Sequence, residues 1–104
     1  MKPEQFKEIV SEMFTQCCDL LNVKEQHYSD GHDRLVQFKT AAQLRGISPV
    51  DALAGMMVKH TTKLYQMLQD EFGKHTQAEW EEVINDHVNY LFLLKALLID
   101  EGAI

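Results

Sequence analysis

The residues best able to do chemistry lie at the start of the last apolar stretch, "EEVINDHVNYLFLLKALL" (81–98). Glu82, Asp86 and Asn89 recur there at intervals of four and three, which places their side chains on one stripe of a helix. Carboxylate oxygens on a rigid element suit a divalent cation whose coordination is completed by groups from a neighbouring helix. A solvated helix face has the same spacing, and both interpretations stay open.

Two basic residues of the preceding helical segment are the natural partners of these acids. His60 lies within an apolar stripe, where a histidine is either a hydrogen-bonded core residue or a ligand. Lys59 beside it could bind a phosphate group or pair with Glu82 or Asp86. We expect Glu82, Asp86 and His60 to face one common cavity.

The segment "HYSDGHDR" (27–34) is the densest polar cluster of the chain. Tyr28, Asp30 and Asp33 are candidate ligand-binding residues there. The free backbone amides of a following helix, together with Arg34, could bind an anion. Ordinary helix capping by Asp30 or Asp33 also explains the same residues.

Helical periodicity and capping signals divide the chain into four segments. Ser48 and Pro49 form a helix start, Thr76 and Glu79 form a capping box, and Gly46 is typical of a left-handed helix end. The expected helices run from Pro3 to about Val23 or as far as Tyr28, from Asp30 or His32 to Gly46, from Pro49 to Glu71, and from Thr76 to about Asp100. In the second helix we expect Leu35, Phe38, Ala42 and Leu44 to face inward.

Short connections and the absence of a strand pattern predict a single all-α domain over residues 1–104, an antiparallel four-helix bundle. The net charge of −6 argues against nucleic acid as a partner, because such proteins need clustered cations. The longest uncharged run of the last helix, "HVNYLFLL", is too short to span a bilayer, so no membrane is expected. The N-terminus is charged and amphipathic rather than signal-like, which favours the cytoplasm.

The second half of the last helix is apolar almost all round. Such a helix is buried on several sides or forms the seam of a dimer. Four short helices do not need both sides of Phe92, Leu93 and Leu97 for one core. We therefore expect a homodimer with twofold symmetry.

Two segments resemble a known family: "HYSDGHDRLVQFKTAAQLRGISPVDALAGMMVKHTTKLYQML" (27–68) and "WEEVINDHVNYLFLLKALL" (80–98). They are similar to small phage and prophage proteins that look like distant relatives of the MazG-type all-α nucleoside triphosphate pyrophosphatases. The shared elements are a Y-x-D turn, a helix carrying Phe38, a "GMMVKH" helix and a last helix of the form E-x-x-x-D-x-x-N-Y. The resemblance implies a MazG-like fold and the cytoplasm of a bacterial host.

In the MazG-like enzymes, acidic pairs on two helices hold Mg²⁺, which bridges the triphosphate. The resemblance implies Glu82 and Asp86 as one such pair. The chain departs from the family at the other pair, because it has no carboxylate between Asp51 and Asp70. Binding is therefore expected, and hydrolysis is left open.

These observations support two hypotheses. In the first, the chain binds a nucleotide or phosphorylated nucleoside, with Mg²⁺ as candidate cofactor held by Glu82 and Asp86. Lys59 would then contact phosphate and Tyr28 the base or sugar, and the remaining ligand-binding residues would be Asp30, Asp33, His60 and Asn89. In the second, the chain is a non-catalytic acidic helical dimer that binds a host or phage protein. Both share one fold, so the fold alone does not choose between them.

Overall fold

The computed structural model describes residues 1–28 and 31–104, except for the side chain of Tyr28. Over these residues the chain forms four α-helices and no β-strand: α1 (Pro3–Tyr28), α2 (Val36–Arg45), α3 (Pro49–Gln69) and α4 (Gln77–Asp100). The prediction of an all-α protein is confirmed. Within the described part of the chain, none of the helices is both long enough and apolar enough to cross a bilayer.

The helix ends predicted from local signals are found in the structure. The Ser48 hydroxyl accepts a hydrogen bond from the Asp51 amide at 3.1 Å, and the Thr76 hydroxyl accepts one from the Glu79 amide at 3.1 Å. Both bonds satisfy backbone donors that a helix start leaves without partners. Gly46 ends α2 in the left-handed conformation with φ of 66°, which glycine adopts without a steric penalty.

Two expectations for the second helix were wrong. The helix begins at Val36 rather than at Asp30 or His32, because the Asp33 carboxylate accepts a bond from the Leu35 amide at 2.9 Å and holds a turn before the helix. Leu44 is 83% exposed. It lies about 200° around the helix from Ala42, at about 100° per residue, so the two cannot share the inward stripe.

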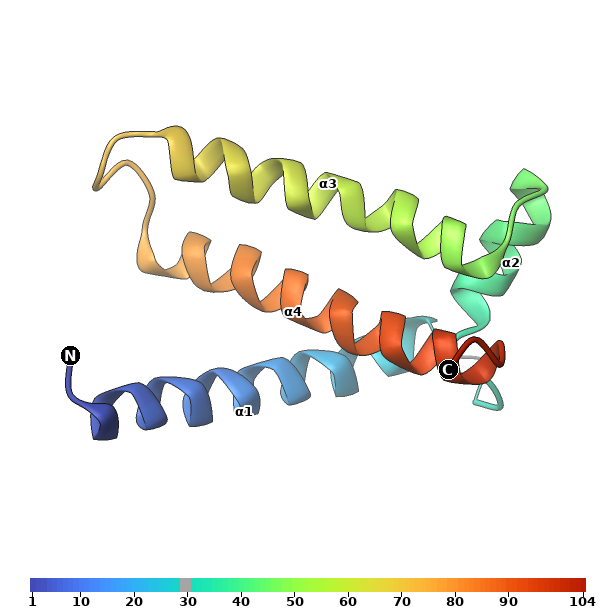
Figure 1. Ribbon diagram of the computed structural model, residues 1–104, viewed down its shortest axis with the longest axis horizontal. Coiled ribbons are helices and arrows are strands. Elements are labelled where there is room, and N and C mark those ends of the chain that lie inside the picture. Colours follow the sequence, from blue (N-terminus) through green and yellow to red (C-terminus); the bar gives the residue numbers. More distant parts are fainter. Residues whose placement is uncertain (29–30) are drawn as a thin grey trace.

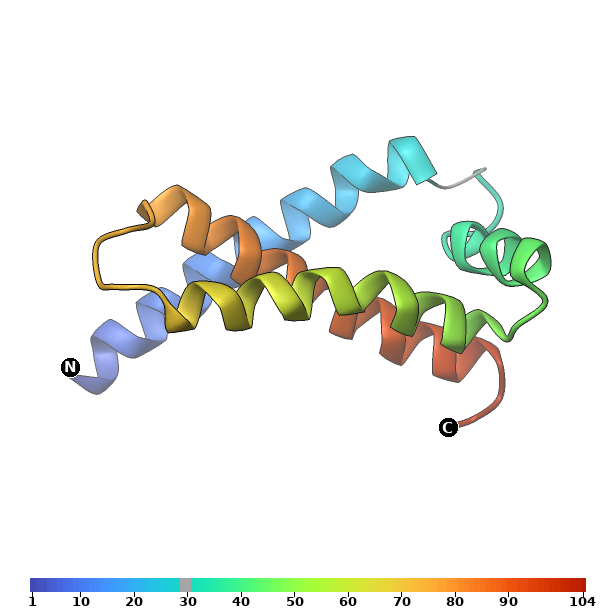
Figure 2. The same ribbon diagram turned by 90° about the horizontal axis from the view of Figure 1, so that it is seen from above.

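The four helices pack against one another in pairs. α3 lies against α4, α1 packs on α4, and α2 packs on α3 at the end where α3 begins (Figure 1). Seen from above, α1 crosses the other two long helices and diverges from them toward its C-terminal end, on the side where α2 lies (Figure 2).

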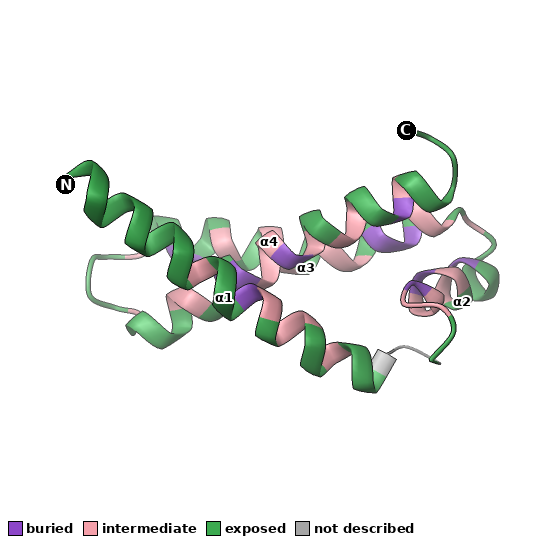
Figure 3. Cartoon of the chain, turned by 90° about the horizontal axis from the view of Figure 1, so that it is seen from below, coloured by how far each residue is buried: buried purple, intermediate pink, exposed green. Residues whose placement is uncertain are grey.

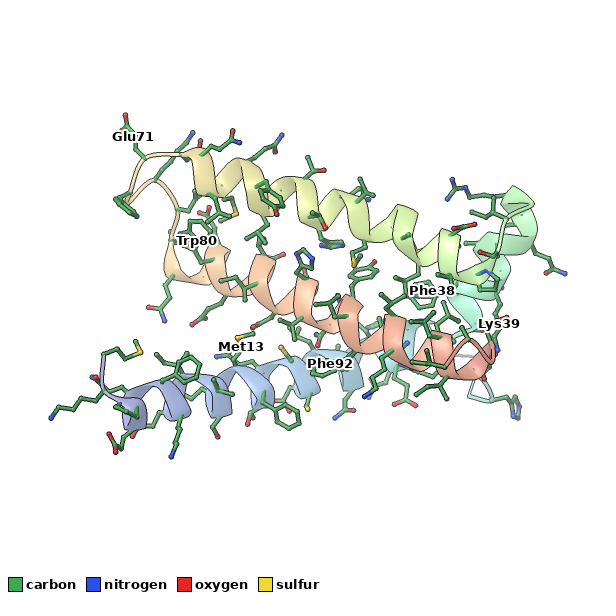
Figure 4. All side chains as sticks on the ribbon, viewed as in Figure 1. Met13, Phe38, Lys39, Glu71, Trp80 and Phe92 are labelled. Carbon is green, nitrogen blue, oxygen red and sulfur yellow. The ribbon has the colours of Figure 1, made fainter. Side chains whose placement is uncertain are left out.

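The main buried cluster fixes the position of α2. It consists of Leu35, Phe38, Leu53 and Leu97, and the last three have no exposed surface. Full burial of one such side chain stabilises the fold by about 1.5–3 kcal/mol. Figure 4 shows Phe38 between α2 and the adjoining ends of α3 and α4, so this cluster ties three helices together.

Large apolar side chains also remain at the surface. Residues 3–12 of α1 are all exposed (Figure 3), and the exposed apolar side chains of this helix include Phe6, Val10 and Phe14. On α4, Leu97 is covered within the chain, whereas Phe92 is 41% exposed. The expectation that Leu97 needs a second subunit for cover was therefore wrong, and cover of Phe92 by a second subunit stays a prediction.

A histidine braces the connection between α3 and α4. His75 Nε2 lies 2.7 Å from the Asp70 carboxylate, and Nδ1 lies 2.9 Å from the Glu79 carboxylate. The ring also meets the edge of Trp80 at a centroid distance of 5.8 Å, and Figure 4 shows Trp80 beside this connection. Hydrogen bonds to Asp70 and then to Glu79 raise the pKa of His75. The protonated ring can donate to both carboxylates and so joins the two helices.

This arrangement predicts that the chain loses thermal stability as the pH rises above about 6.5, the ordinary pKa of histidine. Because folding raises the pKa of His75 above its ordinary value of 6.5, its contribution is complete below that value and is lost as pH rises through the raised pKa. Melting temperatures of wild type and His75→Gln measured over this rise in pH should show a decline in the wild type only. Parallel curves for the two proteins would contradict the prediction.

Candidate ligand-binding site

A cavity of about 620 Å³ lies between the C-terminal half of α1, the α2 region, α3 and α4. Its volume falls within the range of roughly 300–1,000 Å³ that is usual for small-molecule sites. Every helix contributes to the wall, so the cavity depends on how the helices pack. Figure 2 shows the side on which α1 diverges from α3 and faces α2.

The charged side chains on the cavity wall are mostly cationic. Lys24 comes from α1, Arg34 from the turn before α2, Arg45 from the end of α2, and Lys59 from α3. Among the described residues, Asp86 is the one carboxylate on the wall. Four of the ten lysines and arginines of a chain with net charge −6 thus surround one hollow, and such a concentration attracts anions.

Asp86 joins three helices at the wall of the cavity. Its Oδ1 lies 3.3 Å from Nζ of Lys24, and its Oδ2 lies 3.9 Å from Nδ1 of His60. The Asp86 side chain is only 16% exposed, so the attraction to Lys24 is screened less than at an open surface. Both carboxylate oxygens therefore already face groups of the protein.

His60 is held mostly in the neutral form near neutral pH. Burial lowers the pKa of His60, Asp86 opposes this, and the charges of Lys24, Lys59 and His87 lower the pKa further. The imidazole lies against Tyr90, with ring centroids 4.7 Å apart and a tilt of 39°. The two rings give the cavity an aromatic wall on which a planar group could pack.

Two buried asparagines of α4 lie one turn apart and differ in their hydrogen bonds. The Asn85 amide donates to Gln16 Oε1 at 3.0 Å. Asn89 is 2% exposed and lines the cavity, yet neither its Nδ2 nor its Oδ1 has a hydrogen-bond partner among the described residues. A buried amide without a partner is costly, and such groups usually obtain one from a ligand or ordered water.

Arg34 also has a buried polar atom without a partner in the described chain. Its Nη2 donates to the Leu21 carbonyl at 3.5 Å, which ties the guanidinium to α1. Its Nη1 is buried and has no partner within the described chain. The guanidinium is thus anchored on one side, with donor capacity left on the other, and it lines the same cavity as Asn89.

The structure brings together four of the site residues expected from the sequence. Lys59, His60, Asp86 and Asn89 all line the cavity. Glu82 is exposed and does not belong to the lining, so it does not share the cavity with His60 as expected.

Of the expected site residues in the 27–34 segment, the structure describes the side chain of Asp33, which does not line the cavity. Asp33 caps the turn before α2 and pairs with Lys39 at 2.6 Å. The hydrogen bond from Lys39 lowers the pKa of Asp33, which fits the capping interpretation. Asp30 and the side chain of Tyr28 lie outside the described residues.

Lys24 and Arg45 line the cavity but were not expected from the sequence. Lys24 continues the stripe of Cys17 and Leu21 at intervals of four and three, so a cation on an otherwise apolar helix face was a usable signal. No comparable signal marks Arg45. Its place at the cavity depends on the Gly46 turn and on the packing of α2 against α3.

The donors of the site do not form a recognisable metal centre. Within the described residues, no group of three or more histidine, cysteine, aspartate or glutamate side chains is close enough to hold an ion. Of the two predicted ligands, Glu82 is outside the cavity, and Asp86 already faces Lys24 and His60. Coordination of Mg²⁺ by these two residues stays a prediction.

Comparison with known proteins gives no further guide. No protein-family model, no curated protein and no solved structure matched the chain. The MazG-like relationship stays a prediction.

The contact between Asp86 and His60 predicts a change that can be measured directly. Replacing Asp86 with Asn should lower the pKa of His60 further, because the carboxylate is the group that raises it against burial and the nearby cations. NMR titration of the histidine ring protons would measure the shift. The exposed residue Glu82, one turn away, provides the control: Glu82→Gln should leave the pKa of His60 unchanged. A pKa of His60 that stays the same or rises in Asp86→Asn would contradict the assigned geometry.

Proposed function

We propose that the chain binds a nucleotide or phosphorylated nucleoside in the cavity between its four helices. The observation that carries the proposal is the carboxamide of Asn89, which is 2% exposed and has no hydrogen-bond partner among the residues that the structure describes, on a wall that also presents four cations. The cations suit phosphate groups, and the amide can bond to the polar edge of a base or sugar. The proposal is one of binding and assigns no hydrolytic step.

The aromatic wall supports a planar ligand. His60 and Tyr90 pack against each other on one side of the cavity, and base stacking on aromatic side chains contributes about 1–3 kcal/mol per base in known nucleic-acid sites. The predicted antiparallel MazG-like bundle of a phage-type protein and the cytoplasm of a bacterial host belong to the same proposal, in which Mg²⁺ is an optional cofactor.

A thermal-shift panel tests the proposal. Nucleoside mono-, di- and triphosphates are added to the full chain, each with and without Mg²⁺. A ligand that binds the folded state raises the free energy of unfolding by mass action, by about 2.7 kcal/mol at a ligand concentration 100 times Kd. The melting temperature rises as a result. At least one nucleotide should give a concentration-dependent rise, and a flat response across the panel would exclude the proposed site.

A matched pair of variants locates the response. Asn85→Ala gives up a hydrogen bond to Gln16, whereas Asn89→Ala removes an amide that has no partner in the described chain. In urea unfolding, Asn89→Ala should therefore be more stable than Asn85→Ala by about 1–2 kcal/mol. Asn89→Ala should also lose most of the ligand-induced shift, which Asn85→Ala should retain. Equal ligand responses in the two variants would place the ligand elsewhere.

A second candidate function is a non-catalytic homodimer that binds another protein. It is favoured by the exposed apolar side chains of α1 and α4, Phe6, Ile9, Val10, Phe14, Leu91 and Phe92. An apolar groove of about 190 Å³ lies beside them, between α1 and α4. Figure 4 shows Met13 and Phe92 on the facing sides of these two helices. Exposed apolar surface of this extent is typical of a protein interface.

Sedimentation velocity distinguishes this candidate. The wild-type chain should sediment as a dimer, and Phe6→Glu should shift it to a monomer, because Phe6 is 60% exposed on the N-terminal part of α1 and a buried charge opposes association. Tyr65→Glu is the control, since Tyr65 is 61% exposed on α3. A monomeric wild type at high concentration would contradict dimerisation.

A further inference from the structure

We infer that the phosphate groups of the ligand bind directly to Arg34, Arg45 and Lys59, without a divalent cation between them and the protein. This inference rests on the proposed function and adds the chemistry of recognition. It departs from the expectation of bound Mg²⁺, because the described wall of the cavity offers mainly donors for an anion. Mg²⁺ instead prefers oxygen ligands in an octahedral arrangement, with one or two carboxylates besides phosphate oxygens.

Arg34 has the geometry of a prearranged phosphate ligand. The bond from its Nη2 to the Leu21 carbonyl holds the guanidinium in place. Its buried Nη1 has no partner in the described chain. A guanidinium presents a planar set of donors that matches two oxygens of a phosphate group. The side chain therefore needs little rearrangement to accept an anion.

Arg45 reaches the cavity because a glycine faces it. A Cβ atom at Gly55 would lie 3.1 Å from Nη1 of Arg45, closer than most side chains tolerate. The missing side chain lets the guanidinium of Arg45 lie against α3 beside Lys59, which is four residues further along the same helix. The two cations thus meet on one wall although they come from different helices.

Asp86 is better placed as an internal counter-ion than as a metal ligand. Lys24 lies 3.3 Å from one carboxylate oxygen, and His60 lies 3.9 Å from the other. A divalent cation at Asp86 would have to displace the ammonium group of Lys24 or lie close to it, and like charges at such distances repel. The pairing leaves Arg34, Arg45 and Lys59 as the cations available to a phosphate group.

The inference is tested with inorganic triphosphate as the probe and the full chain as the receptor. Calorimetric titrations are done in EDTA and in excess Mg²⁺. Binding should be at least as tight in EDTA as in Mg²⁺, because Mg²⁺ neutralises part of the charge that the protein recognises, and it should weaken as NaCl is added. Binding that requires Mg²⁺ would overturn the inference but leave the proposed function intact. No binding of triphosphate or of any nucleotide, in either condition, would overturn both.

Two charge-neutralising variants identify the contacts, and a third serves as the control. Arg45→Gln and Lys59→Gln change exposed residues and should fold normally, and each should weaken triphosphate binding in EDTA by about tenfold, as expected for loss of a charge-assisted hydrogen bond. Lys63→Gln is the matched control, one turn further along α3 and outside the cavity lining, and should change the affinity less than about twofold by screening alone. Wild-type affinity in both test variants would overturn the inference.

Discussion

The burial of Phe38 against Leu53 and Leu97 is the interaction on which the rest of the structure depends. All three side chains are fully buried and come from three different helices. Their burial contributes about 1.5–3 kcal/mol each, whereas an exposed ion pair contributes about 0–1 kcal/mol. The pairs from Lys39 to Asp33 and Asp100 therefore orient α2, and the apolar cluster holds it. Figure 4 shows Lys39 near the end of α4.

The charge of the cavity follows from this packing. With Phe38 turned toward α3 and α4, the ends of the α2 region carry Arg34 and Arg45 to the cavity, where they meet Lys24 of α1 and Lys59 of α3. These four cations are at least 10 residues apart in the sequence. An acidic chain thus acquires a local cationic site through tertiary packing alone, and this explains why total charge says little about the ligand of a single cavity.

Local signals made most of the fold predictable, and tertiary packing limited what could be predicted of the site. Ser48, Thr76 and Gly46 cap helices through contacts with residues close to them in the sequence, so their roles could be inferred from the adjacent residues. His60 and Asp86 could be proposed to meet because each lies on the inward stripe of its helix. The position of Arg45 at the cavity could not be predicted, because it depends on a turn and on a glycine in another helix.

The error at Leu44 lay in the periodicity itself. At about 200° around the helix from Ala42, Leu44 lies outside the inward stripe, and 83% of its surface is exposed. Glu82 failed for the opposite reason. It shares a stripe with Asp86, but the cavity begins one turn further along α4, where α1 and α3 approach that helix, and periodicity does not reveal where a neighbouring helix makes contact.

α4 presents the two candidate functions on different faces. Asp86, Asn89 and Leu93 line the cavity, whereas Val88 and Phe92 line the apolar groove beside α1. α1 is divided in the same way along its length, since the cavity uses residues of its C-terminal half, whereas Phe6, Val10 and Phe14 are exposed in its N-terminal half. A second copy packed on the N-terminal half of α1 would leave the cavity accessible. The two proposals therefore draw on separate residues and are compatible in one chain.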